Sequence, residues 1–184
     1  MKRSKILPEI HAGSMADIAF LLLIFFLVST TLPNEQGIVR TLPPNCETGD
    51  CSAHIIEQNI FRIQLNKQDE LMVNGELIPI RELPKRLTEF IDNNGDRTCN
   101  YCQGASLETG SQNPTKAIVS LTTARESSYK EYIAVQGIIS MVYLELREQY
   151  IRKVYRKKFD ELSEEEMTRV RKAYPLLLSE ASVQ

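Results

Sequence analysis

Residues 15–32 read Met-Ala-Asp-Ile-Ala-Phe-Leu-Leu-Leu-Ile-Phe-Phe-Leu-Val-Ser-Thr-Thr-Leu, and every side chain from Ile18 to Val28 is apolar. No other segment of the sequence is apolar enough to cross a membrane. A helix over this stretch rises about 1.5 Å per residue and is roughly 25 Å long, slightly shorter than a hydrocarbon core of about 30 Å. We therefore predict a single N-terminal transmembrane helix at residues 15–32.

A secretory signal peptide is the competing interpretation of this stretch. The strictly apolar part is no longer than the central region of a signal peptide, and Lys2, Arg3 and Lys5 precede it as a basic region would. Against cleavage, the apolar run ends in Val-Ser-Thr-Thr without an Ala-x-Ala type site, and Glu9 and Asp17 stand before the strictly apolar part. The residues favour an uncleaved anchor and leave both interpretations open.

Charged and structure-breaking residues divide the chain into parts. Lysine and arginine are retained on the cytoplasmic side of a membrane, so the basic residues predict a cytoplasmic arm at 1–14 and place everything after Leu32 across the membrane. Pro, Gly and Asn recur through residues 33–58, where we expect a linker. Residues 59–184 are long enough for one domain of ordinary size.

Asp17 is the residue with the clearest functional potential. An ionisable side chain one turn into a membrane helix is costly unless it faces protein or water, so it is a functional candidate. The competing interpretation is structural, because Ser14-Met-Ala-Asp17 fits a capping pattern in which Asp17 only satisfies amides at the helix start. The residues alone do not decide between the two.

The helical face that contains Asp17 is otherwise apolar until Thr31. Spacings of four and three residues place Leu21, Ile24 and Val28 between them on that face. A partner protein must then supply polar contacts to Asp17, or the carboxyl group must bind a proton, because apolar surroundings disfavour the charged form. One charge that crosses the membrane potential is worth about 2.3 kcal/mol per 100 mV. An aspartate in this setting is suited to a proton-driven switch.

The run from Ser14 to Thr31, preceded by Leu7-Pro8-Glu9-Ile10, resembles the signature of the ExbD/TolR biopolymer-transport proteins. The resemblance is specific over residues 7–43 and loose after them. It implies a bacterial inner-membrane protein with a short cytoplasmic tail, one transmembrane helix with an essential aspartate, and a periplasmic domain. Asp17 occupies the position of that aspartate, and the resemblance removes the signal-peptide interpretation.

The resemblance also implies partners. The helix would sit in inner-membrane lipid as one of a pair inside a pentameric ring of ExbB-type subunits, where the aspartate carries protons inward. The motion would pass to a TonB-like transducer, which we favour, or to a Tol-like one, and the second copy would be identical or a paralogue. A formal net charge of −2 indicates no nucleic-acid partner. We expect no enzymatic activity and no cofactor, since the sequence has neither a Gly-rich phosphate loop nor a nucleophile elbow.

One short segment of the linker could be extended. Gly37-Ile-Val-Arg-Thr-Leu-Pro43 is similar to the Val-x-Leu-Pro stretch that follows the helix in the resembled family, where it can add as a strand to a partner subunit. Ile38, Val39 and Leu42 are the candidate contact residues. A plain tether that buries nothing is the alternative.

Hydrophobic periodicity predicts the first half of the soluble domain. Alternation over 61–65 indicates a half-buried strand, the polar run 66–70 a turn, and 71–75 a returning strand. Pro84 stands in the first turn of an amphipathic helix that ends at Asn93-Asn-Gly95. The apolar stripe of this helix consists of Leu83, Leu87, Phe90 and Ile91.

The second half adds a strand at 117–121 and a long helix. Ser128 offers an N-cap with Glu131 three residues later. The order strand, strand, helix, strand, helix predicts an α+β protein with a small two-layer α/β domain. The stripe of the long helix consists of Val135, Ile138, Ile139, Val142 and Leu146.

Beyond Leu146 the sequence departs from the family pattern, which would close with a strand soon after the second helix. Instead we expect a charged helical extension at 148–184, with a Glu148–Arg152 pair on its surface. The basic segment 152–158, which contains Tyr155, could in isolation suggest RNA or anionic lipid, but neighbouring acidic residues favour a solvated helix face. Ser163 caps a further short helix, and Pro175 to Ser179 is the candidate for a displaced last strand.

Four cysteines follow the membrane helix as two close pairs, Cys46/Cys51 and Cys99/Cys102, the second within an inserted loop at 93–115. An oxidising compartment favours disulfides, with three possible connectivities. Cys99-Asn-Tyr-Cys102 has the spacing of a thiol-redox motif, and the two pairs together could hold a tetrahedral zinc ion. Because Cys99 lies in a polar loop and not at the start of a helix, where a dipole would lower the thiol pKa, we favour structural disulfides. These cysteines support a second functional hypothesis: a membrane-anchored or secreted disulfide protein with a binding or thiol-redox role.

Overall fold

The computed structural model of the chain describes residues 12–29 and 56–183. The chain divides into two units with the boundary between Cys51 and Ser52. Among the described residues, the first unit contains one helix and the second a mixed α/β domain, and each is described by itself.

Helix α1 runs from Ala12 to Ser29. With 18 residues, this helix is long enough and apolar enough to cross a membrane. At about 1.5 Å per residue it measures roughly 27 Å. The helix starts three residues before the predicted start at Met15, and the predicted end at Leu32 lies outside the described residues.

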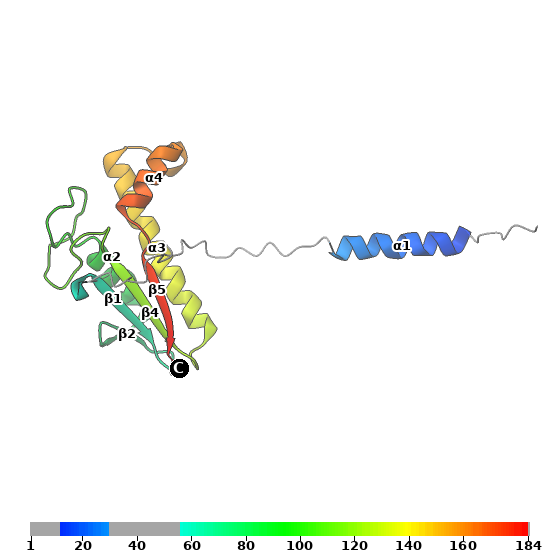
Figure 1. Ribbon diagram of the computed structural model, residues 1–184, viewed down its shortest axis with the longest axis horizontal. Coiled ribbons are helices and arrows are strands. Elements are labelled where there is room, and N and C mark those ends of the chain that lie inside the picture. Colours follow the sequence, from blue (N-terminus) through cyan, green and yellow to red (C-terminus); the bar gives the residue numbers. More distant parts are fainter. Residues whose placement is uncertain (1–11, 30–55, 184) are drawn as a thin grey trace, which may run out of the picture. The chain divides into compact units, whose positions relative to one another are not determined.

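The domain contains a five-stranded mixed sheet in the order β3-β2-β1-β4-β5 (Figure 1). Strand β2 pairs antiparallel with both of its neighbours, β3 and β1, whereas β1, β4 and β5 run parallel to one another. The strands are β1 Ile60–Leu65, β2 Leu71–Val73, β3 Glu76–Ile78, β4 Ile118–Ala124 and β5 Leu178–Val183.

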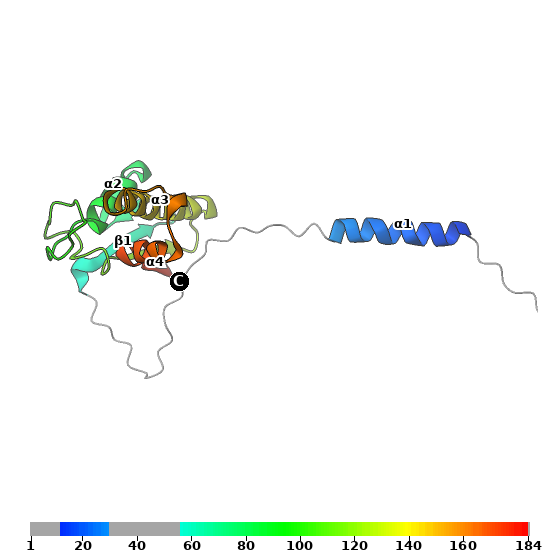
Figure 2. The ribbon, with the colours of Figure 1, turned by 90° about the horizontal axis from the view of Figure 1, so that it is seen from above.

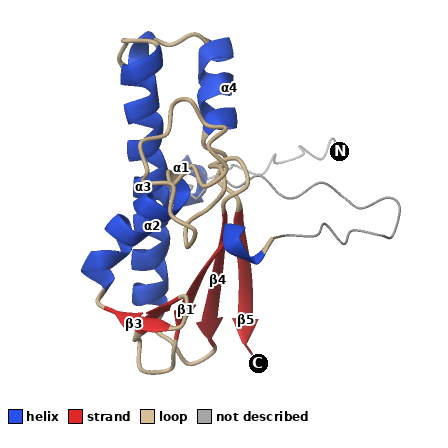
Figure 3. Ribbon diagram, turned by 90° about the vertical axis from the view of Figure 1, so that its left-hand side faces the viewer, coloured by secondary structure: helices blue, strands red, loops and turns tan. Residues whose placement is uncertain are grey.

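Two helices cover one face of this sheet as a second layer (Figure 2). They are α2, Leu83–Ile91, and α3, Tyr129–Val154. Helix α4, Glu164–Ala173, lies beside the C-terminal half of α3 and beyond the end of the sheet where the parallel strands begin (Figure 3). Short 3₁₀ helices occur at Glu57–Asn59, Ile80–Glu82 and Phe159–Glu161.

Strand β1 has the predicted half-buried pattern, with Phe61, Ile63 and Leu65 facing the core. The return strand predicted at 71–75 is present as β2, which pairs antiparallel with β1 but ends at Val73. The strand that follows it, β3, was not predicted, and it forms a hairpin with β2. Asn74 and Gly75 form its turn with φ values of 49° and 89°. Positive φ at both central residues is typical of a type I′ hairpin turn, for which Asn-Gly is a preferred dipeptide.

The two predicted apolar stripes are confirmed as the helical side of the core. All four stripe residues of α2 are buried, and in α3 only Ile138 is partly exposed. Ser128 is the N-cap of α3, and its Oγ accepts a hydrogen bond from the Glu131 amide at 3.3 Å. The largest fully buried side chains are Tyr143, Ile63, Leu83, Leu87, Ile91, Leu121, Ile139, Leu146, Ile151, Val119, Val135 and Val142.

The C-terminal extension is an integral part of the domain. The Glu148–Arg152 ion pair is present at 2.7 Å, and the capping box of α4 joins Ser163 and Glu166 in both directions. The displaced last strand is confirmed, but it begins at Leu178 and not at Pro175. It adds in parallel beside β4, so β5 forms one edge of the sheet.

The inserted loop is organised around the buried side chain of Asn93. Its Nδ2 donates to the carbonyl oxygens of Leu107 and Ser111 at 2.8 and 2.9 Å, and its Oδ1 accepts from the Leu107 amide at 2.7 Å. A Cβ at Gly110 would lie 2.3 Å from Asn93 Cγ, so only glycine fits there. One buried amide therefore holds a loop that has no regular structure.

Candidate functional site

Asp17 lies inside α1, and the structural interpretation of this residue is wrong. An N-cap residue precedes the helix and has non-helical backbone geometry. Because α1 begins at Ala12, Ser14 is already its third residue and cannot be the cap. Asp17 is the sixth residue and falls outside the first turn. Capping therefore does not explain its presence.

Asp17 is the only charged residue among the 18 of α1. Helical spacing places it on one face with Leu21, Ile24 and Val28. No residue of α1 is buried in the single chain, and its large apolar side chains are 42–65% exposed. Such a surface is stable only against lipid or against other apolar helices.

The structure joins Cys99 and Cys102 by a disulfide, with their Cα atoms 5.6 Å apart. Cys99 is buried, and the bond lies in the inserted loop, away from any helix start. Within residues 12–29 and 56–183, no three His, Cys, Asp or Glu side chains gather in a way that could hold a metal ion. Cys46 and Cys51 lie outside the described residues, as do the strand candidates Ile38, Val39 and Leu42.

Tyr101, between the two cysteines, connects the inserted loop to the C-terminal extension. Its hydroxyl donates to the carbonyl oxygen of Ala173 at 2.9 Å, and its carbonyl oxygen accepts from Lys153 Nζ at 2.9 Å. Its ring packs edge-on against Tyr150 and Tyr174, with centroids 4.9 and 5.4 Å away. These contacts close the loop onto α3 and α4.

A buried carboxylate reinforces the same junction. The Tyr174 hydroxyl donates to Asp92 at 2.6 Å, and the Gln103 amide donates to the other carboxylate oxygen at 2.9 Å. Burial raises the pKa of Asp92 above its ordinary value, although both hydrogen bonds and the charge of Lys153 act in the opposite direction. Burial and the Asp92 hydrogen bond also raise the pKa of Tyr174. Sequence reasoning missed this cluster, because its members are far apart in the chain.

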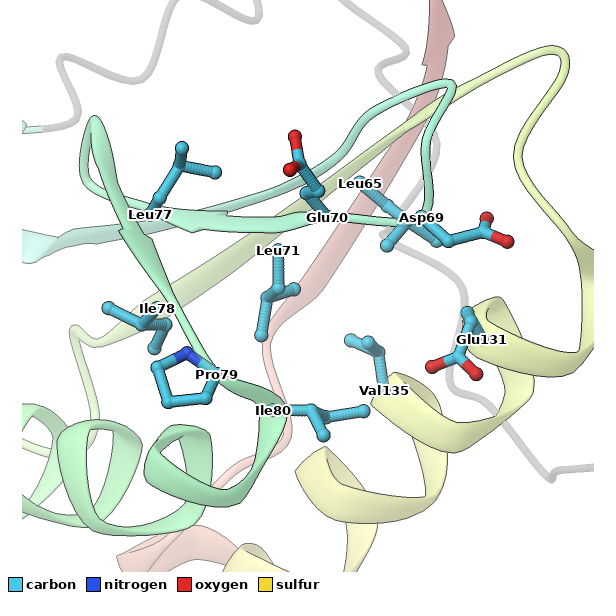
Figure 4. Close-up of a pocket in the computed structure, with 10 residues that line it drawn as sticks. All are labelled: Leu65, Asp69, Glu70, Leu71, Leu77, Ile78, Pro79, Ile80, Glu131 and Val135. Atoms are coloured by element: carbon cyan, nitrogen blue, oxygen red, sulfur yellow. The ribbon is translucent and has the colours of Figure 1, made fainter.

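A hollow of about 410 Å³ lies between the β2–β3 hairpin and the first turns of α3 (Figure 4). Three acidic residues, Asp69, Glu70 and Glu131, are among those that line it, and Figure 4 shows the Glu70 carboxylate pointing away from Leu71. We call this hollow the acidic groove. The sequence analysis did not predict this groove. The adjacent acidic residues Asp69 and Glu70 are the only local feature of the sequence that points to it. Its other lining residues are Leu65, Leu71, Leu77, Ile78, Pro79, Ile80 and Val135.

A family model described as "Biopolymer transport protein ExbD/TolR" matches residues 3–144. The match runs from the N-terminal arm through the inserted loop into the middle of α3, and the C-terminal extension lies outside it. Comparisons with curated proteins and with solved structures returned no match. Members of this family are non-enzymatic components of biopolymer transport that are anchored in the inner membrane, and they work with ExbB/TolQ-type and TonB/TolA-type partners. Because the family model covers most of the 184 residues, the chain belongs to the ExbD/TolR family.

Proposed function

We propose that this protein is the proton-carrying subunit of an ExbB–ExbD type motor that uses the proton-motive force to power TonB-dependent transport across the outer membrane. The observation that carries the proposal is Asp17, the single charged side chain of an apolar helix that belongs to an ExbD/TolR chain. Membership of the family makes this the expected site of proton transfer.

The chemistry follows from the surroundings of the carboxyl group. The charged form of Asp17 cannot face lipid without a large cost, so α1 must turn that face toward protein or water. A ring of five ExbB-like subunits around two copies of α1 would supply such a face. Protonation would neutralise Asp17 and allow α1 to move past apolar partners, and release of the proton would restore the attraction to polar groups. Repeated cycles would convert proton flow into motion of α1.

The proposed orientation places the N-terminus in the cytoplasm and the soluble domain in the periplasm. Lys2, Arg3 and Lys5 favour this direction by the positive-inside rule. The disulfide between Cys99 and Cys102 is in keeping with it, since disulfides persist in oxidising compartments.

The soluble domain would pass the motion to a TonB-like transducer, with a Tol-like system as the alternative. Within the described residues, β3 and β5 form the two edges of the sheet. An edge strand can accept an added strand through its free backbone groups. The segment around Ile38, Val39 and Leu42 of a second copy, identical or paralogous, would add at one of these edges.

Substitution of Asp17 by Asn tests the proposal. Asparagine keeps the size and polarity of the side chain but binds no proton in this pH range. Transport that depends on the proton-motive force should fall to background, while the variant should still co-purify with its ExbB-like ring. Energised uptake and co-purification from membranes are the two measurements.

Ser14→Ala is the matched control, because Ser14 lies in the same helix and has no proton to exchange near neutral pH. It should transport normally. Normal transport by an assembled Asp17→Asn variant would show that the proton-carrying role is wrong.

The disulfide favours one second candidate, a membrane-anchored periplasmic protein with a binding or thiol-redox role. In that case Cys99→Ser would abolish activity and Asp17→Asn would be silent. The two substitutions therefore separate the candidates in a single assay.

A further inference from the structure

We infer that the acidic groove binds an extended peptide segment in which a lysine or arginine stands between apolar residues. The inference rests on the proposed function, because it identifies the groove as a contact surface for the transducer partner. Burial, hydrogen bonding, charge and strand position each contribute to it.

The floor of the acidic groove is apolar and its rim is partly open. Leu71 and Ile78 are 5% and 8% exposed, whereas Leu77 next to them is 57% exposed. Figure 4 shows Leu71, Ile78 and Val135 pointing into the hollow from the hairpin and from α3. A volume of about 410 Å³ is sufficient for one or two side chains of a partner.

Glu131 contributes a carboxylate that the helix start does not use. In a complete capping box, the Glu three residues after the N-cap accepts a hydrogen bond from the N-cap amide. Here Asp69 accepts from the Ser128 amide instead, at 2.7 Å. Helix α4 shows the complete arrangement, in which Glu166 accepts from the Ser163 amide at 2.8 Å.

Because Asp69 has taken that role, the Glu131 side chain is available for a ligand. Within residues 12–29 and 56–183, the structure gives its carboxylate no hydrogen bond and no ion pair. It is half-buried and lies at the same end of the acidic groove as Asp69 (Figure 4). A partly buried carboxylate without a partner favours a cation that approaches it from outside.

The charge of the acidic groove is of one sign. Its lining residues include three acidic ones and no lysine or arginine. Glu70 accepts a hydrogen bond from Asn66 Nδ2 at 2.7 Å, which adds no positive charge. The groove therefore attracts a cationic segment and repels nucleic acid or anionic lipid headgroups.

The position of β3 favours an extended partner. Residues 77 and 78 of this strand line the acidic groove, and β3 is the edge of the sheet on that side. An extended peptide beside β3 would form backbone hydrogen bonds and send alternate side chains toward the groove. Apolar residues on both sides of a basic one match the apolar floor and the acidic rim.

Binding of labelled peptides to the full-length protein in phosphatidylcholine nanodiscs tests this inference. The probe is fluorescein-Gly-Val-Lys-Val-Lys-Val-Gly, and its charge-reversed counterpart carries Glu in place of Lys. Fluorescence anisotropy should show saturable binding of the lysine peptide and none of the glutamate peptide, after subtraction of empty nanodiscs.

Glu131→Gln should weaken binding of the lysine peptide about three- to tenfold through loss of one charged contact. Leu77→Ser should also weaken it. Glu145→Gln is the control, since this exposed carboxylate lies on the same helix but outside the acidic groove, and it should bind as the unmodified protein does. Equal binding of both peptides, no saturable binding, or identical affinities for Glu131→Gln and Glu145→Gln would each overturn the inference.

The failure of this inference is distinguishable from that of the proposed function. If Asp17→Asn abolishes transport while Glu131→Gln changes neither peptide binding nor transport, only the inference about the acidic groove is wrong. If Asp17→Asn transports normally, the motor function itself is wrong, whatever the peptides do.

Discussion

Asp92 joins three parts of the domain through one carboxyl group. It is the C-cap residue of α2, and it accepts hydrogen bonds from Gln103 of the inserted loop and from Tyr174 beyond α4. Burial disfavours its charged form and raises its pKa, against the opposing effects of Tyr174, Gln103 and Lys153. The folded protein therefore binds a proton at Asp92 more tightly than the unfolded chain does.

The stability contributed by Asp92 should consequently fall as the pH rises. A raised folded-state pKa stabilises the protein below the unfolded-state pKa, and this contribution is lost as the pH passes through the folded-state value. The difference in the free energy of unfolding between the unmodified protein and Asp92→Asn should therefore decline from about pH 4 upward. Urea unfolding at several pH values measures it.

Asp96 supplies a control of opposite sign. Its pKa is lowered, first by the hydrogen bond from the Thr98 side chain and also by the Thr98 amide and Lys116. The difference in the free energy of unfolding between the unmodified protein and Asp96→Asn should therefore grow as the pH rises. Slopes of the same sign for the two variants would contradict this account of Asp92.

At the scale of elements, the inserted loop and the C-terminal extension depend on each other. Tyr101, held between Cys99 and Cys102, packs on Tyr150 and Tyr174 and bonds to Ala173. The family match includes the loop but ends before the extension. The loop therefore owes part of its conformation to the part of the chain that departs from the family pattern.

Removal of the disulfide should loosen this junction. A bond that closes so short a loop restricts the unfolded chain by about 2 kcal/mol. The double variant Cys99→Ser/Cys102→Ser should lose about that much free energy of unfolding, and a reductant should destabilise the unmodified protein but not the variant. Denaturant unfolding with and without reductant gives both values, and a variant as stable as its parent would exclude a structural role of the bond.

At the scale of the whole molecule, α1 and the domain form separate units with separate requirements. The domain has its own buried core, whereas no residue of α1 is buried. Replacement of Ala12–Ser29 by an unrelated apolar helix of 18 residues should therefore leave membrane insertion and the thermal unfolding of the domain unchanged. Transport should be lost, because the new helix has no proton-binding group.

Membrane fractionation, calorimetry and energised uptake test this replacement. Re-introduction of one aspartate at the position of Asp17 is the informative control, since it shows whether the carboxyl group alone is sufficient or the α1 surface is also needed. Full transport by the unrelated helix would reduce α1 to an anchor.

Local patterns in the sequence were sufficient to predict most of the helices and strands. The period of two residues in β1, the stripes of α2 and α3, and the caps at Ser128 and Ser163 are all confirmed. These features depend on neighbours no more than four residues away. Strand β3 was missed although Asn74-Gly75 is a strong hairpin signal, because a strand of three residues is too short for a period to be counted.

The sequence alone determined the membrane helix, the position of its one charged residue, the family, and the order of most elements, because each is expressed in composition or in short spacings. Only the tertiary structure decided that Asp69 replaces Glu131 at the cap of α3, that Tyr174 reaches Asp92, and that β5 closes the sheet beside β4. Those contacts join residues from 59 to 82 positions apart. Such partners are selected by how the core packs, and no local pattern records that choice.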